Sequence, residues 1–208
     1  MALWVSYPLA KKHFKKWPRR GPAFKEDSRI QSHVSADDYW LSGYDRGHLA
    51  PGYAVWAVSG PKARRETYLM SNIVPQRKSL NQKLWQRLEE VAADYFPLYF
   101  DNITVYAGPV FVEPDEYLDS GLAVPDAYYK IFSAYQNGRL MVLGFIMPQN
   151  VQGNESLDDY VVSIDKIEQL TGIDFFHWLS DSTQASLESA RLTYPWNLKN
   201  LADLPGRY

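Results

Sequence analysis

The chain contains no cysteine, and this absence restricts its chemistry. Without thiols it has no disulfide, no thiolate metal site and no cysteine nucleophile, although the compartment is left open. The longest uninterrupted apolar run, Leu140 to Pro148, is too short to cross a bilayer. The sequence also shows no repeat, no low-complexity segment and no helix-turn-helix or zinc-finger pattern. These absences disfavour a membrane-spanning helix, a disulfide scaffold and a sequence-specific DNA reader.

What the chain does contain is enough apolar material for a folded core. Its 208 residues are 46% hydrophobic and 15% aromatic, which excludes a disordered protein and favours one domain over 1–208. No signal peptide is recognisable, because Met1 leads directly into WVSYPL without a basic and an apolar segment. The localisation therefore stays unknown. We expect the chain either to remain in the cytoplasm or, as a mature or trimmed form, to be exported.

Positive and negative charges are distributed unevenly along the chain. Residues 1–90 hold 16 lysines and arginines against 8 acidic residues, a net charge of +8. Residues 91–208 hold 6 against 16, a net charge of −10. Basic clusters such as KKHFKKWPRR give the first part the charge of a phosphate-facing surface. A solvated basic face explains the charge equally well, so charge alone does not decide the function.

The order of the expected elements indicates an α+β fold. Strands are expected over 4–9, 68–74, 98–112, 128–135 and 140–147. The Asn137-Gly138 pair is typical of a tight hairpin between the last two. Apolar residues at helical spacing predict an amphipathic helix from Ser79 to Tyr95, with Ser79 as its cap and Gln82 as the reciprocal partner. Shorter helices are expected at 164–171 and from about residue 181. Because strands and helices do not alternate strictly, an α+β domain is favoured.

The stretch SGYDRGHLAPGY, residues 42–53, places charged side chains between apolar neighbours. Arg46 is suited to two-point contact with a phosphate, and a neutral His48 can accept a proton from water. Gly47 between them would let a bulky ligand approach the backbone. A lone histidine among apolar residues is more often a core residue, so the interpretation depends on the rest of the sequence.

The segment SNIVPQRKSLNQKLWQRLE, residues 71–89, offers oxygen donors that a hard divalent cation prefers. They are Asn72, Gln76, Asn81 and Glu89. In a continuous helix Asn81 and Glu89 lie about 12 Å apart along the axis. Both cannot then bind one Mg²⁺ directly at about 2.1 Å. A workable arrangement has Asn81 as the direct ligand and Glu89 orienting metal-bound water, although each residue taken singly is better explained as an ordinary polar helix residue.

Together these motifs resemble the DNA/RNA non-specific endonucleases of the ββα-metal superfamily. The match runs through YDRGHLAP (44–51), the 71–89 block, YAGPVF (106–111) and TGIDFF (171–176), and so covers nearly the whole chain. DRGH alone would be a weak signal, but DRGH with the asparagine–glutamate block at this spacing is specific. The resemblance implies an α+β domain with a central, mainly antiparallel sheet flanked by helices, and a ββα-metal active-site motif.

The resemblance also implies a base and a metal site. His48 would be the general base, with its second ring nitrogen held by a backbone carbonyl. Asn81 would bind a single Mg²⁺ directly, and Glu89 would act on it through water. Mn²⁺ is expected to substitute for Mg²⁺.

The remaining matched residues would bind phosphate or support the site. Arg46 and an upstream arginine would contact phosphate, with Arg20 a better match for the second than the adjacent Arg19. Supporting roles would fall to Asp45, through the geometry of a turn, and to Asn72 and Gln76.

The implied function is Mg²⁺-dependent hydrolysis of phosphodiester bonds in DNA and RNA, which would be contacted through their backbone phosphates. Two alternatives stay open: a catalytically inactive nucleic-acid-binding module with the same fold, and a phosphodiesterase acting on small nucleotides. A homodimer and an inhibitor protein are further partners to consider, but no residue establishes either.

Overall fold

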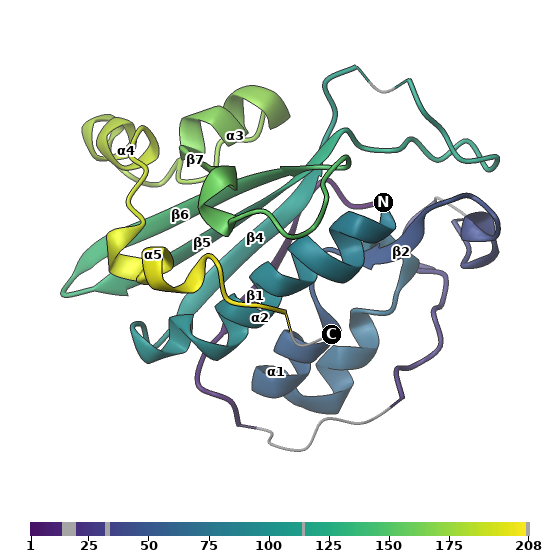
Figure 1. Ribbon diagram of the computed structural model, residues 1–208, viewed down its shortest axis with the longest axis horizontal. Helices are drawn as coiled ribbons and strands as arrows, with labels where there is room; N and C mark the ends of the chain where they lie inside the picture. Colours follow the sequence, from purple (N-terminus) through teal and green to yellow (C-terminus); the bar gives the residue numbers. More distant parts are fainter. Residues whose placement is uncertain (14–19, 32–33, 114, 207–208) are drawn as a thin grey trace.

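The computed structural model describes residues 1–13, 20–31, 34–113 and 115–206 (Figure 1). Its main sheet has five antiparallel strands in the order β1-β4-β5-β6-β7. These strands are β1 (Val5–Leu9), β4 (Ile103–Val110), β5 (Ala127–Gln136), β6 (Arg139–Pro148) and β7 (Val161–Val162). A separate antiparallel pair consists of β2 (Asp45–His48) and β3 (Ile73–Gln76). The predicted α+β class with a mainly antiparallel sheet is confirmed.

The β5–β6 hairpin forms as its turn residues predict. Asn137 and Gly138 have φ values of 52° and 76°, the left-handed conformation that a two-residue turn requires at both positions. The two strands then pair from Gln136 opposite Arg139 to Ala127 opposite Pro148. Each strand extends one residue beyond its predicted range at both ends.

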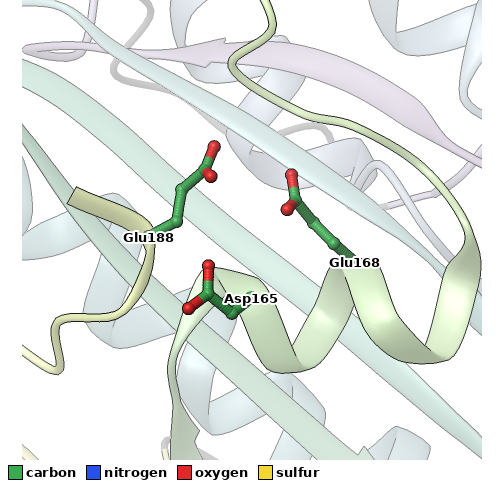
Figure 2. A group of neighbouring side chains, drawn as sticks. All are labelled: Asp165, Glu168 and Glu188. Atoms are coloured by element: carbon green, nitrogen blue, oxygen red, sulfur yellow. The ribbon is translucent and has the colours of Figure 1, made fainter. Parts of the chain in front are cut away.

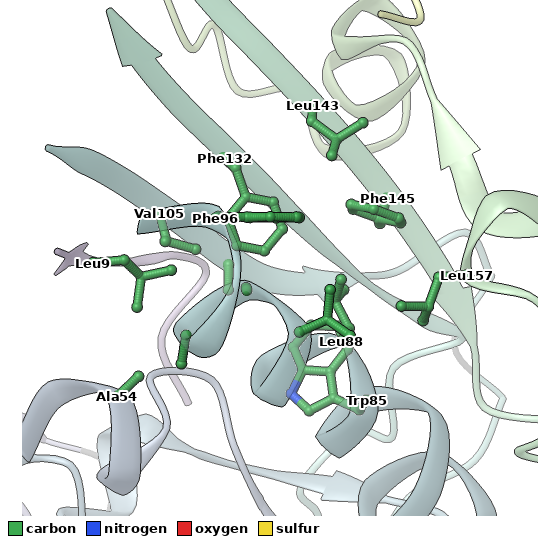
Figure 3. Packing of buried hydrophobic residues seen from close by; sticks show 14 of the residues in the cluster. Leu9, Ala54, Trp85, Leu88, Phe96, Val105, Phe132, Leu143, Phe145 and Leu157 are labelled. Atoms are coloured by element: carbon green, nitrogen blue, oxygen red, sulfur yellow. The ribbon is translucent and has the colours of Figure 1, made fainter. Parts of the chain in front are cut away.

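Helices cover both faces of the five-stranded sheet (Figure 1). Because side chains alternate along a strand, β5 contributes to two separate apolar clusters. On one face Tyr129 and Ile131 pack with α3 (Ile164–Thr171), beside which lies α4 (Asp181–Glu188). On the other face β5 packs against α1 (Gly52–Glu66), α2 (Gln86–Asp94) and α5 (Leu198–Leu201). Figure 3 shows Phe132 and Phe145 of the sheet above Leu88 and Trp85 in this second layer.

Helix α1 was not expected from the sequence. Gly60 has φ 82° and ψ −170°, and Pro61 follows it, so the helix is kinked in its middle. The kink interrupts the helical periodicity on which a sequence prediction depends.

Two strand predictions were also too long. The chain at Met70–Asn72 forms a 3₁₀ turn before β3, and Phe96–Leu98 forms another before β4.

The predicted helix after Ser79 is present but begins differently. Ser79 already has helical angles and makes no side-chain cap hydrogen bond, so the predicted cap is wrong. The chain then passes through a π-helical segment, Leu80–Trp85, before α2. Such segments are rare and occur frequently at functional sites. Asn81 lies in this segment, so its side chain is not placed as a regular α-helix would place it.

Within the described residues, every helix is too short or too polar to cross a membrane.

Candidate active site

The predicted site residues gather around the β2–β3 pair and the helix that follows it. In this pair Asp45 lies opposite Gln76, and His48 lies opposite Ile73. Alternation along β2 directs Asp45 to one side of the strand and both Arg46 and His48 to the other. The indole nitrogen of Trp85 donates to the backbone carbonyl of His48 at 3.2 Å, which joins the helix to the strand. Two strands and a helix thus form one unit.

The Asp45 carboxylate connects β2 to the π-helical segment. Its Oδ2 accepts hydrogen bonds from Asn81 Nδ2 at 2.9 Å and from Gln82 Nε2 at 2.8 Å. Because Asp45 holds the amide nitrogen of Asn81, the amide oxygen of Asn81 is left as the acceptor for another group. Asp45 lies in a strand rather than in the expected turn, and the residue that it orients is Asn81.

The His48 ring lies in an aromatic cage. The centre of the Phe24 ring is 5.7 Å away, and that of Tyr68 is 4.8 Å away with the planes at 75°. Among the described residues, His48 Nε2 is covered and has no hydrogen-bond partner, so the backbone carbonyl expected at one ring nitrogen is not found there. Burial lowers the pKa of His48 to about 4, and the ring is therefore neutral at pH 7.

This lowered pKa predicts a loss of stability in acid. The pKa of the ring is about 4 in the folded chain against an ordinary 6.5, so the unfolded chain binds a proton first as pH falls. The stability that the neutral ring confers is complete above pH 6.5 and is lost as pH falls through 4, by about 3 kcal/mol. Urea unfolding between pH 7 and 4 measures this loss. In His48→Gln that part of the pH dependence should disappear, and an unchanged pH dependence would contradict the assignment.

Asn72 and Gln76 lie behind the strand pair. Asn72 Nδ2 donates to the carbonyls of Ala50 and Thr67 at 3.0 and 2.8 Å, and its Oδ1 accepts from the Ala50 amide at 3.0 Å. Asn72 therefore holds in place the segment that follows β2.

Gln76 is fully buried under Gly47. A Cβ added to Gly47 would come within 2.0 Å of Gln76 Oε1. Glycine is needed at this position for the approach of Gln76, which corrects the expectation that it makes room for a ligand.

Glu89 is paired with a buried lysine that the sequence analysis missed. Lys130 of β5 is fully buried, with Nζ 2.9 Å from Glu89 Oε1 and 4.1 Å from the centre of the Trp85 ring. Burial raises the pKa of Glu89 and lowers the pKa of Lys130, and the attraction between the two charges opposes both shifts. The signal available in the sequence was a lysine in the middle of the apolar strand AYYKIFSAY. Lys130 fixes the position of the Glu89 carboxylate.

A pocket of about 350 Å³ opens beside Asp45 and Asn81. Arg46 and Phe24 also line it, and the Arg46 guanidinium carbon lies 4.9 Å from the centre of the Phe24 ring. Arg46 Nη1 is 3.5 Å from the carbonyl oxygen of Ala36 on the same wall. Phe24 contacts both Arg46 and the ring of His48, so the histidine cage adjoins this pocket.

Arg20 lies next to Gly21, which packs against the Tyr68 ring of the histidine cage: an added Cβ on Gly21 would come within 2.5 Å of the Tyr68 hydroxyl. The side chain of Arg20 is exposed, and the Arg20 backbone carbonyl accepts a hydrogen bond from Arg64 Nη2 at 2.9 Å. Among the described residues, the Arg20 side chain makes no hydrogen bond or ion pair with the other predicted site residues. The alternative phosphate contact, Arg19, lies outside the described residues.

The β2–β3 pair and the helix after it form a unit of two strands and a helix that carries His48 and Asn81, as expected for a ββα motif. Residues 1–182 match the sequence family described as DNA/RNA non-specific endonuclease. The match covers most of the chain, and the protein therefore belongs to the DNA/RNA non-specific endonuclease family.

Several curated relatives are about equally similar. Human mitochondrial endonuclease G is 31% identical over 191 residues, which cover 84% of this chain and 63% of that protein. Nuclease C1 of Cunninghamella echinulata var. echinulata is 31% identical over 182 residues, covering 80% and 71%. Mitochondrial nuclease EXOG of Xenopus laevis is 31% identical over 176 residues, covering 76% and 48%. The chain thus spans from about half to about seven tenths of the length of these relatives.

A solved structure of the EndoG/EndoGI complex, on the mechanism of EndoG inhibition, shares the fold. Its TM-score is 0.76 at 24% sequence identity, and the match covers 86% of this chain and 80% of that one. A homodimer and an inhibitor protein stay predictions for this chain.

Proposed function

We propose that this protein is a metal-dependent endonuclease that hydrolyses phosphodiester bonds in DNA and RNA with little sequence specificity. One observation carries the proposal: Asp45 holds the amide of Asn81 at a pocket lined by Arg46, next to a caged, neutral His48. We also propose that residues 1–208 form a single nuclease domain.

The side chains around Asn81 fit a hydrated divalent cation. The Asn81 amide oxygen is available because its nitrogen donates to Asp45 at 2.9 Å, and the Asp45 carboxylate adds negative charge nearby. Mg²⁺ usually keeps several waters and takes only one or two protein ligands. Glu89, held by Lys130, would orient such water rather than bind the ion directly. When bound, the ion would stabilise the negative charge that develops on the phosphoryl and leaving oxygens.

His48 is suited to accept a proton from the attacking water. Its ring is neutral at pH 7, because burial lowers its pKa to about 4. We assign the proton-accepting atom to Nδ1, since Nε2 is covered. In that tautomer the N–H at Nε2 would face the aromatic cage, and the Tyr68 ring 4.8 Å away would be a weak acceptor for it.

Arg46 would bind the phosphate backbone from the pocket wall. Arg46 is exposed, and its guanidinium lies over the Phe24 ring with only a long contact from Nη1 to the Ala36 carbonyl, at 3.5 Å. Arg20 would contact phosphate through its exposed side chain. Trp40, which is 80% exposed, also lines the pocket and would stack on a base beside the bound phosphate. None of these contacts reads a base edge, in keeping with low sequence specificity.

Digestion of supercoiled plasmid and of RNA tests the proposal. In Mg²⁺ we expect nicked and linear plasmid and shortened RNA, and excess EDTA should abolish both activities because it would remove the ion proposed to stabilise the developing negative charge. Binding of both polymers without cleavage in Mg²⁺ or Mn²⁺ would instead favour the inactive binding module. Cleavage of a small phosphodiester with intact plasmid would favour the small-nucleotide phosphodiesterase.

A further inference from the structure

Helices α3 and α4 bring three carboxylates together on the face of the sheet opposite α2. One oxygen each from Asp165, Glu168 and Glu188 lies within 4.8 Å of the others. Asp165 and Glu168 are on adjacent turns of α3, and Glu188 is the last residue of α4. Figure 2 shows the three carboxylates around a common space, with Asp165 and Glu168 on α3 and Glu188 on the segment beside it. This cluster contains none of the residues of the candidate active site.

Glu188 supplies a second observation, independent of this clustering. It is only 4% exposed, and its Oε1 is covered and has no hydrogen-bond partner among the described residues. The salt bridges of the described chain involve none of the three carboxylates. A buried carboxylate oxygen without a donor is costly unless a proton or a cation compensates it.

The surroundings of Glu188 favour a positive ligand. Burial, followed by the charge of Glu168, raises the pKa of Glu188 to about 7; a hydrogen bond from Gln184 opposes the shift, and the charges of Asp165 and Asp174 add to it. Burial also raises the pKa of Glu168. Glu168 is nevertheless held in place, because its Oε1 accepts a hydrogen bond from the Phe175 amide at 2.8 Å. The cluster thus combines concentrated negative charge with at least one fixed carboxylate.

The spacing of the carboxylate oxygens suits a large hard cation. Calcium binds oxygen at about 2.3–2.6 Å, so oxygens up to about 5 Å apart can share one ion. Magnesium binds at about 2.1 Å and demands regular octahedral geometry, which carboxylates from two short helices meet less readily. Calcium also accepts irregular sets of carboxylates and waters, which fits ligands that come from two short helices.

We propose that Asp165, Glu168 and Glu188 form a calcium site that joins α3 to α4. It is separate from the proposed nuclease site and does not depend on it. The ion would neutralise Glu188 and would hold the end of α4 against α3. Calcium would therefore stabilise this side of the protein whether or not the chain cleaves nucleic acid.

Calcium binding to the full chain tests the proposal. We would use Asn81→Ala as the parent in every sample, so that ion binding at the nuclease site is weakened to the same extent throughout. Isothermal titration with CaCl₂ at pH 7.5 should show one calcium per chain, and thermal denaturation should show a higher Tm with calcium. In the Glu168→Gln/Glu188→Gln variant we expect the affinity to fall by about tenfold or more and the shift in Tm to disappear.

The matched control is Asp181→Asn, which removes an exposed carboxylate from the first turn of α4. It should bind calcium like the parent. Equal calcium affinity in the double glutamine variant and the parent would overturn the proposal. The proposal would also be overturned if the parent bound no calcium at millimolar concentration and the double glutamine variant were more stable than the parent. A proton shared between the carboxylates would then explain the cluster. Circular dichroism establishes that each variant is folded before the comparison is made.

Discussion

Replacing His48 by alanine is expected to lower Mg²⁺-dependent plasmid nicking by about 10²–10⁴-fold, the usual contribution of a general base. The ring is neutral in the folded chain, and no other histidine lies among the predicted site residues. Initial rates of conversion of supercoiled plasmid to the nicked form measure the effect. The His177→Ala variant is the control, because His177 is exposed and outside the predicted site. A His48→Ala variant with a tenth or more of the normal rate would refute the assigned role.

The pH dependence of the rate provides a second measure of the same residue. An unperturbed histidine would lose activity as pH falls through about 6.5. In its cage His48 has a pKa lowered to about 4, so we expect its contribution to stay constant down to about pH 5 and to be lost below that. An activity that falls with a midpoint near 6.5 would show that the ring is not caged in the working enzyme.

Replacing Asn81 by alanine is expected to lower turnover by about 10²–10³-fold at a fixed Mg²⁺ concentration, as loss of a group that stabilises transition-state charge does. The change removes the amide oxygen assigned to the ion and also releases Asp45 from its hydrogen bond at 2.9 Å. A Mg²⁺ titration of plasmid nicking should show a higher concentration at half-maximal rate. Part of the lost rate should return at high Mg²⁺.

The Gln82→Ala variant separates these two effects. Gln82 donates to the same Asp45 oxygen at 2.8 Å but is not assigned to the ion. The Gln82→Ala substitution should therefore lower the activity much less than Asn81→Ala does, and it should leave the Mg²⁺ dependence nearly unchanged. An Asn81→Ala variant with the wild-type Mg²⁺ dependence would remove Asn81 from the metal site.

Local signals in the sequence predicted the elements that depend on a few neighbouring residues. The Asn137-Gly138 turn formed because both residues tolerate positive φ. Gly172, with φ 69°, ends α3 for the same reason. The kinked helix α1 was missed because Gly60 and Pro61 obscure its periodicity, although packing against β1 maintains it.

The candidate site was predicted in its residues but not in its contacts. The sequence pointed to Asp45 and Asn81 separately, and only the fold joined them through a hydrogen bond 36 residues apart in the chain. The sequence showed Lys130 only as a lysine in an apolar strand, and the fold alone showed that it holds Glu89, 41 residues away. Contacts of this kind depend on how strands and helices pack, and no short sequence pattern encodes them.

By itself, then, the sequence determined the family, the α+β class and the residue types available for phosphodiester chemistry, because motifs and periodicity are written in consecutive residues. The tertiary structure alone decided the protonation state of His48, the orientation of the Asn81 amide and the meeting of α3 with α4 at Glu188. Each of these depends on desolvation or charge contributed by segments that are distant in the sequence. Burial is a property of the folded chain, and it converts an ordinary histidine or glutamate into a group with a shifted pKa.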